Sequence, residues 1–338
     1  MRRLLHYLKG YEKETVLAPL FKMLEACFEL LVPLVVAAIV DTGIQNRDVG
    51  QIWRQGGLLV LLAVVGLVSS VTAQYFAAKT ALGYGTALRR DLYHHINTLS
   101  YTELDGIGTP TLVTRMTSDI NQLQNGVNMT LRLLLRCPFI VIGALIMALT
   151  ISPQMTAWFL LVTVLISLVI YLIMRMTVPR YHQAQSMLDK VTLLTRENYV
   201  GTRVVRAFSR QNDEIRDFTE TNDTLKKVQT VAGRISALMN PMTYLIVNFG
   251  IVVVLLRGGV LVNEGALTQG AIIALISYMN QILTNLLRMA DLVISVTRAL
   301  ASGIRVNELL NTTSGMPDPA DSGAKELPPV AEAPAVAF

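Results

Sequence analysis

Six segments of this chain are apolar over enough length to cross a lipid bilayer, which constrains its fold more than any other feature. A helix needs about 20 largely apolar residues to span the hydrocarbon core. The six segments are Val16–Val40, Gly57–Ala78, Leu133–Thr150, Ala157–Val178, Tyr244–Val262 and Ala271–Leu292. Hydrophobic residues make up 52% of the chain and charged residues 16%. A soluble domain of this length needs more polar surface than this composition supplies. The sequence therefore predicts an all-α membrane protein with six transmembrane helices.

The distribution of cations predicts the orientation of these helices. Of 29 Lys and Arg residues, only Arg47, Arg54 and Arg257 fall in or beside the connectors after the first and fifth spans, and residues 152–156 contain none. Cytoplasmic loops of membrane proteins collect Lys and Arg, so both termini are expected in the cytoplasm. The same tendency accounts for the net charge of +5 without any nucleic-acid partner.

The segment before the first span has the pattern of an interfacial helix. Met1–Glu14 is short and amphipathic, with leucines and tyrosines on one side and cations on the other. Such a helix lies in the membrane interface and differs from a cleavable signal. We therefore expect residues 1–15 to form an interfacial elbow. The two cysteines, Cys27 and Cys137, lie far apart in apolar stretches, so neither a disulfide framework nor a metal site is expected.

Two long polar segments predict helical hairpins outside the bilayer. Residues 79–132 separate the second span from the third, and residues 179–243 separate the fourth from the fifth. Both are rich in helix formers and too polar to span. Two helices of roughly 25 residues, at about 1.5 Å per residue, would project about 35–40 Å into the cytoplasm and return. Hairpins of this length suit a machine that takes motion from a cytoplasmic partner.

Each hairpin carries a distinctive stretch at its tip. Residues 104–120 read LDGIGTPTLVTRMTSDI, in which Asp105-Gly106 and the residues around Gly108 predict a turn. Arg115 and Asp119 then share one face of the following helix, four positions apart. Residues 197–208 read ENYVGTRVVRAF, whose last apolar residues predict a compact knob flanked by cations. The alternatives are a plain helix-loop-helix tip and a helix packed on its own neighbour.

These stretches resemble the membrane domain of bacterial multidrug-type ATP-binding-cassette (ABC) exporters. The first tip is similar to the family's first cytoplasmic loop, with Leu104 where the family has phenylalanine. RLLLRCPF at residues 132–139 is similar to the third span, with Cys137 where alanine is usual, and ALASGIRVNELL at 299–310 to the exit from the sixth. The resemblance covers about residues 1–310 and implies a six-helix domain over residues 16–310. It also implies that two tips contact an ATPase domain, through Leu104, Asp105, Gly108, Thr109, Arg115, Val205, Arg206, Phe208, Gln211 and Asn212.

The resemblance implies an ATPase that residues 1–338 do not contain. Residues 311–338 have the composition of a linker, and their last residues resemble the start of the family's nucleotide-binding domain. A G-x-x-x-x-G-K-[ST] phosphate loop is absent from the sequence, so the chain has no expected catalytic, cofactor or metal site of its own. ATP and Mg²⁺ would be bound by the nucleotide-binding domains, and two half-transporters, identical or different, would enclose the pathway in the bacterial plasma membrane. Either the chain is a fragment or its ATPases are separate.

Ionisable residues inside the predicted spans are the candidates for a substrate cavity, since charges at membrane depth are costly. They are Glu25, Glu29, Arg132, Arg136, Arg288 and Asp291. Glu25 and Glu29 share one helix face and could favour cationic amphipathic substrates. The alternative is pairing of Lys22 with Glu25 near the inner interface and of Arg288 with Asp291 in the sixth helix. Arg132 and Arg136 either anchor the third span or meet the two carboxylates.

The function expected on these grounds is ATP-driven export of amphipathic drugs or lipids. A lipid or peptide exporter of the same fold is an alternative within the family. A secondary transporter or an ATP-independent membrane scaffold is the alternative from another class, and each leaves the cytoplasmic hairpins unexplained.

Overall fold

The computed structural model describes residue 4 and residues 6–315, and six helical stretches in this part of the chain are long and apolar enough to cross a membrane. They are Glu12–Ile44, Val49–Asn97, Thr109–Ile151, Pro153–Ala207, Gln211–Asn263 and Gln269–Leu310. Each stretch contains one of the six predicted spans. Together they confirm the all-α membrane fold.

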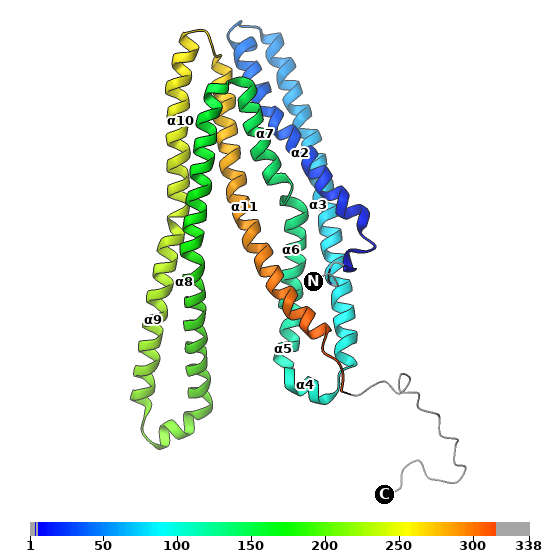
Figure 1. Ribbon diagram of the computed structural model, residues 1–338, viewed down its shortest axis with the longest axis vertical. Coiled ribbons are helices and arrows are strands. Elements are labelled where there is room, and N and C mark those ends of the chain that lie inside the picture. The colour runs from blue at the N-terminus through cyan, green and yellow to red at the C-terminus, as the bar shows by residue number, and fades with distance from the viewer. Residues whose placement is uncertain (1–3, 5, 316–338) are drawn as a thin grey trace, which may run out of the picture. The chain divides into compact units, whose positions relative to one another are not determined.

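Several stretches consist of more than one helix (Figure 1). The elements are η1 (His6–Leu8), α2 (Glu12–Ala38), η2 (Ile39–Ile44), α3 (Val49–Asn97), α4 (Tyr101–Ile107), α5 (Thr109–Thr114), η3 (Arg115–Asp119), α6 (Ile120–Leu133), α7 (Arg136–Ile151), α8 (Pro153–Ala207), α9 (Gln211–Ala237), α10 (Met239–Asn263) and α11 (Gln269–Leu310). η1 is a single 3₁₀ turn, and η2 and η3 are short π-helical segments.

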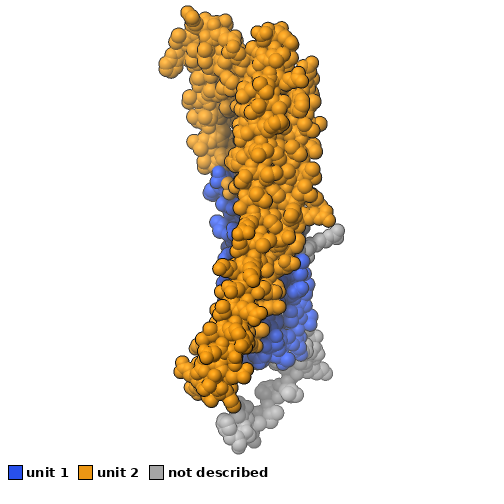
Figure 2. Space-filling view, turned by 90° about the vertical axis from the view of Figure 1, so that its left-hand side faces the viewer, with its two compact units in different colours: residues 1–18, 74–131, 293–338 blue, residues 19–73, 132–292 orange. Residues whose placement is uncertain are grey.

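The chain divides into two compact units, coloured separately in Figure 2. Unit 2 comprises residues 19–73 and 132–292. Its core is built from small and aliphatic side chains of the membrane-length helices, with Phe159 and Tyr278 as its largest fully buried members. Gly250 lets α10 approach its neighbours closely, because a Cβ there would lie 2.9 Å from the sulfur of Met279 and 3.0 Å from Val162. Packing of this kind is what holds helices together in lipid.

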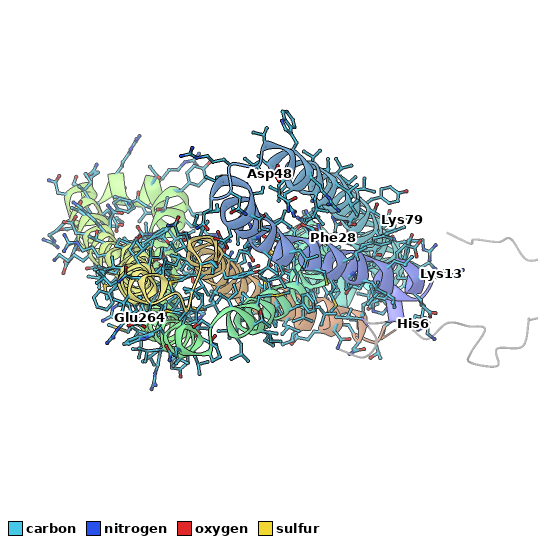
Figure 3. All side chains as sticks on the ribbon, turned by 90° about the horizontal axis from the view of Figure 1, so that it is seen from above. His6, Lys13, Phe28, Asp48, Lys79 and Glu264 are labelled. Carbon is cyan, nitrogen blue, oxygen red and sulfur yellow. The ribbon has the colours of Figure 1, made fainter. Side chains whose placement is uncertain are left out.

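Three short connectors lie at one end of unit 2 (top of Figure 1). They are residues 45–48, Ser152 and residues 264–268. Figure 3 labels Asp48 and Glu264, one in each of the longer two. The short connectors leave their flanking helices antiparallel, as expected for spans that return directly through the membrane.

Unit 1 comprises residues 1–18, 74–131 and 293–338, of which the described residues have a core of their own. Leu88, Leu92 and Ile120 are fully buried there, together with Val306 and Leu309 near the end of α11. Lys79 of α3, labelled in Figure 3, donates a 2.8 Å hydrogen bond to Glu14 of α2. The end of α11 is therefore packed against the first hairpin, which is a contact that sequence spacing could not predict.

The third predicted span, Leu133–Thr150, is not one uniform helix. α6 ends at Leu133 and α7 begins at Arg136. Pro138 has no N–H to donate to the carbonyl of Leu134, so the regular hydrogen-bond ladder is interrupted there. The next amide, that of Phe139, makes the regular helical bond to the carbonyl of Leu135 at 3.2 Å. The interruption therefore separates α6 from α7, and Arg136 is the first residue of α7.

The predicted interfacial elbow, residues 1–15, is only partly described. Leu4 is helical, η1 forms a 3₁₀ turn, and Gly10, with a φ of 96°, separates them from α2. Glycine adopts this left-handed conformation at little cost. Residues 1–3 and 5 lie outside the described part, as do residues 316–338 of the predicted linker.

Candidate functional site

Four charged side chains meet in unit 2 at the junction of α2 and α7. Lys22 forms an ion pair with Glu25, one turn away on α2. The Arg136 guanidinium lies 2.5 Å from the Glu29 carboxylate and 3.7 Å from that of Glu25. Two cations thus balance two carboxylates. The structure brings together three of the predicted cavity residues and adds Lys22 to them.

Polar neighbours complete this charge cluster of Lys22, Glu25, Glu29 and Arg136. Lys22 donates to the Ser70 hydroxyl at 3.1 Å, and Arg136 approaches the amide oxygen of Asn285 at 3.5 Å. Lys22 and Arg136 are almost fully buried, with 5% and 6% of their surface exposed. Buried charges are tolerated when they are paired and hydrogen-bonded. Lys22 and the two terminal nitrogens of Arg136 meet this condition, whereas the Arg136 Nε has no partner among the described residues.

The cluster lies deep in the membrane-length helices. Glu29 is about 22 Å along the helix axis from Ile44, and Arg136 is about 22 Å from Ile151, at 1.5 Å per residue. The hydrocarbon core is about 30 Å thick. Measured from residues 45–48 and Ser152, the cluster therefore falls in the far half of a layer of that thickness.

A proline explains why α11 docks beside this cluster. Pro33 has no N–H, so the carbonyl of Glu29 loses its helical donor. The Gln281 side-chain amide donates to that carbonyl at 3.3 Å, and the Tyr278 hydroxyl donates to the carbonyl of Leu30 at 2.7 Å. The sequence analysis missed Tyr278, Gln281 and Asn285. These three residues could have been found from the sequence, because they are polar and lie at positions i, i+3 and i+7 on one face of the sixth span.

The remaining predicted cavity residues lie outside the cluster. Arg132 is half-buried in the last turn of α6, and its Nε has no hydrogen-bond partner within the described chain. Arg288 and Asp291 are both exposed, and among the described residues they form no ion pair with each other or with another group. The local pair expected from their spacing is therefore not formed.

The tip of the first hairpin is a short helix, which corrects the predicted turn at Asp105-Gly106. Ser100 and Glu103 form a capping box that starts α4, and both predicted turn residues lie inside this helix. The chain turns at Gly108, whose φ is 78°. Asp105 and Thr109 are exposed, whereas Leu104 packs partly into the core of unit 1.

Glu103 also contacts the chain after α11. One of its carboxylate oxygens accepts a hydrogen bond from the Gly315 amide at 3.1 Å, and the other is bonded to Ser100. The hydrogen bond from the Ser100 hydroxyl, aided by the Gly315 amide, lowers the pKa of this carboxyl. His95 contacts the carbonyl of Thr312 at 3.0 Å. Two contacts thus fasten the residues after α11 to the first hairpin.

Arg115 and Asp119 do not form the expected i, i+4 pair. They lie in η3, whose π-helical winding changes their relative positions. Asp119 is buried and accepts two hydrogen bonds from Arg305 of α11, one of them 3.0 Å long. Arg115 is half-buried, so this predicted contact residue is less accessible than the exposed residues at the tip.

The tip of the second hairpin is a tight turn between two long helices. α8 ends at Ala207, Ser209 takes a φ of 53°, and α9 begins at Gln211. The Phe208 side chain is 74% exposed and that of Val204 is 61% exposed, whereas Val205 is half-buried. Arg206, Gln211 and Asn212 are exposed as well. The predicted apolar knob is therefore present, with Val204 and Phe208 as its accessible members.

Six membrane-length helices, a paired charge cluster within them and two long helical hairpins define a polytopic membrane domain of the transporter class. The family model for the ABC transporter transmembrane region matches residues 15–286, and the chain belongs to this family. It is thus a multi-pass membrane protein of the ABC transporters, in agreement with the motif resemblance.

Known relatives agree with this family. An uncharacterized ABC transporter ATP-binding protein of Mycobacterium bovis is 33% identical over 93% of this chain and 54% of its own length. YfiB of Bacillus subtilis, of the same description, is 28% identical over 92% of this chain and 54% of its own. A fatty acid ABC transporter ATP-binding/permease protein of Mycobacterium bovis is 30% identical over 69% of this chain and 37% of its own. The chain spans about half the length of the first two.

Proposed function

We propose that this chain forms the substrate pathway of an ATP-driven exporter and receives its driving motion at the two hairpin tips. The observation that carries the proposal is the exposure of Val204 and Phe208 at the turn between α8 and α9. Exposed aromatic and aliphatic side chains at the end of a long polar arm are typical of a protein contact. Asp105 and Thr109 at the first tip are the corresponding residues there.

The partners that fit this role are nucleotide-binding domains and a second half-transporter. ATP and Mg²⁺ would bind to the nucleotide-binding domains, and their closure would draw the tips together. The description of the relatives as ATP-binding proteins supports this assignment. The cation distribution supports a cytoplasmic location of both termini, and the bacterial relatives support a bacterial plasma membrane location.

For the substrate we propose an amphipathic molecule, either a drug or a lipid. The carboxylates of Glu25 and Glu29 are each matched by a cation in the charge cluster, which weakens the electrostatic case for cationic substrates. The relative that carries the name of a fatty acid transporter favours the lipid class. Glu29, whose side chain is 36% exposed, is the cluster member most open to a substrate headgroup.

The test is ATPase activity of the full-length gene product in proteoliposomes, alone and co-expressed with a second half-transporter. Val204→Ser with Phe208→Ser removes the accessible knob, and Leu193→Ser is the control, an exposed leucine on α8 far from the tip. We expect turnover to fall roughly tenfold in the tip variant, equivalent to about 1.4 kcal/mol of contact free energy. Unchanged turnover in the tip variant would contradict the coupling role.

A second arm of the same assay addresses the substrate. Fatty acids and cationic amphiphiles are added separately, with wild type and with Glu29→Gln. If fatty acids stimulate ATPase turnover and Glu29→Gln changes the size of that stimulation, the result supports a lipid pathway past the cluster. Stimulation by cationic amphiphiles alone supports drug export instead, and Glu29→Gln would then be expected to weaken it.

A further inference from the structure

A hollow on the surface of α8 combines apolar and cationic residues at the level of the membrane surface. It is an open depression of about 530 Å³, lined by Leu172, Arg175, Met176, Pro179, Arg180 and Gln183 of this one helix. Most of these residues repeat every three to four positions, so they share one helix face. The hollow is thus amphipathic along its length, with its apolar residues nearer the start of α8.

The position along α8 places this hollow at the inner interface. Counted from Pro153 at 1.5 Å per residue, Leu172 lies about 29 Å along the helix and Gln183 about 45 Å. The hydrocarbon core ends after about 30 Å, and the headgroup layer follows. The exposed tyrosines Tyr171 and Tyr181 flank the hollow, as aromatic residues do at membrane surfaces. Leu172 therefore meets acyl chains, whereas the cations meet headgroups.

The charge of the hollow is not compensated within the described residues. Neither Arg175 nor Arg180 forms an ion pair there, and the Arg180 guanidinium donates a hydrogen bond to the carbonyl of Met176 at 3.1 Å. The sequence of α8 contains no acidic residue before Asp189. Both arginines line the hollow, although they are five positions apart on α8. Two unpaired guanidinium groups attract an anion, and guanidinium geometry suits a phosphate.

Pro179 adds a hydrogen-bond acceptor to the wall of the hollow. Its ring nitrogen carries no hydrogen, so the carbonyl of Arg175 receives no bond from the helical position that would normally supply one. A free carbonyl beside two cations suits a ligand that carries both a phosphate and a hydroxyl group. A choline or ethanolamine headgroup carries a cation of its own. The lining of the hollow contains no carboxylate to pair with that cation, so these headgroups fit less well.

We propose that this hollow binds the headgroup of an anionic phospholipid of the inner leaflet, of the phosphatidylglycerol type. Arg175 and Arg180 hold the phosphodiester, and a headgroup hydroxyl donates to the carbonyl of Arg175. Leu172 and Met176 contact the first methylenes of the acyl chains. The site is separate from the charge cluster and from the hairpin tips, and it depends on neither of their proposed roles.

The experiment measures contact between a lipid and a single tryptophan in the protein reconstituted in phosphatidylcholine vesicles. Trp53 and Trp158 are replaced by phenylalanine, and Leu172→Trp places the reporter in the hollow. Phosphatidylglycerol or phosphatidylcholine brominated near the headgroup is added at equal mole fraction, because bromine quenches tryptophan only at contact. Arg175→Gln with Arg180→Gln removes the proposed ligands, and Lys226→Gln with Lys227→Gln removes equal charge from the exposed surface of α9.

We expect a quenching association constant about five- to tenfold larger for phosphatidylglycerol than for phosphatidylcholine. The preference should vanish in the arginine variant and persist in the lysine variant. Equal quenching by the two lipids, or a preference that survives loss of both arginines, overturns the proposal. Abolition of the preference by excess inorganic phosphate would also overturn it, in favour of a free-phosphate site. If the tryptophan variant fails to fold, retention of phosphatidylglycerol by the unaltered chain and by the arginine variant is compared by native mass spectrometry.

Discussion

The Arg305 guanidinium donates two hydrogen bonds to the Asp119 carboxylate, although 186 positions separate these residues in the chain. Ser302, one turn before Arg305, receives a further bond from the same guanidinium at 2.9 Å. The Asp119 side chain is 4% exposed and that of Arg305 is 49% exposed. A buried carboxylate is therefore held by a cation that reaches it from the solvent side, which joins α11 to the first hairpin inside unit 1.

Arg305→Gln is expected to destabilise unit 1, because the Asp119 carboxylate would stay buried without its cation. The cost should be roughly 1–3 kcal/mol, below the value for a fully buried pair since Arg305 is half-exposed. Thermal unfolding of the purified protein measures it. Arg298→Gln is the control, because Arg298 is exposed on the same helix without an ion pair in the described residues. Equal melting temperatures for the two variants would contradict the role of the pair.

Arg136→Gln is expected to be the most damaging single change in the charge cluster. It leaves Glu29 without its ion-pair partner, while Glu25 keeps Lys22, at an expected cost of about 3–5 kcal/mol. Adding Glu29→Gln should recover much of the loss, because the double variant leaves fewer charges unmatched. Unfolding in detergent measures all three proteins, with Arg132→Gln as the control. A double variant less stable than Arg136→Gln alone would argue against direct pairing.

The contact between Glu103 and Gly315 should depend on pH. The pKa of Glu103 is lowered in the folded protein from an ordinary value of 4.5 by the bonds from Ser100 and Gly315. The contact is therefore fully present above 4.5 and is lost as the pH falls through the lower folded-state value. A nitroxide on Thr313→Cys, in a Cys27→Ser background, should gain mobility in that acidic range.

The matched variant for this measurement is Glu103→Gln. It removes the titrating group, so the nitroxide should show no acid-induced gain in mobility over the same range. A gain of equal size in both proteins would show that another group controls the segment after α11.

Gly270→Ala is expected to destabilise unit 2. A Cβ at Gly270 would lie 2.3 Å from the carbonyl oxygen of Ala37 and 2.7 Å from the Asp41 carboxylate, which accepts the Gly270 amide at 2.8 Å. The backbone of α2 cannot yield easily, so a loss of about 1–3 kcal/mol is expected in thermal unfolding. Gly259→Ala is the control, since nothing lies within 4 Å of its added Cβ. That change should be neutral or stabilising by up to about 1 kcal/mol.

Hydrophobic length predicted the six helices correctly because a bilayer imposes that length on any chain that crosses it. The composition of residues 197–208 predicted an apolar knob at the second tip, and Val204 and Phe208 are exposed there. Composition failed at Asp105-Gly106, because the capping box of Ser100 and Glu103 stabilises a helical turn that composition alone disfavours. Local propensity also suggested that Asp119 would pair with Arg115, whereas Asp119 pairs with a residue brought near by tertiary packing.

The candidate site was predictable only in part for a related reason. Glu25, Glu29 and Arg136 stand out as charges in apolar segments, and the structure joins them. Which charge meets which depends on the break before α7 and on the docking of α11, neither of which a linear pattern encodes. Gln281 and Tyr278 were not predicted, because uncharged polar residues are common in membrane spans and their role depends on partners that the sequence does not reveal.

The free carbonyl that Pro33 leaves on α2 has a consequence for movement. Since the Gln281 amide occupies that carbonyl and the Tyr278 hydroxyl occupies the next, a sliding step of α11 past α2 would strip two donors from oxygens that lipid cannot satisfy. Such a step is therefore costly, and the parts of the first and sixth spans that lie in unit 2 are expected to move together rather than slide past each other.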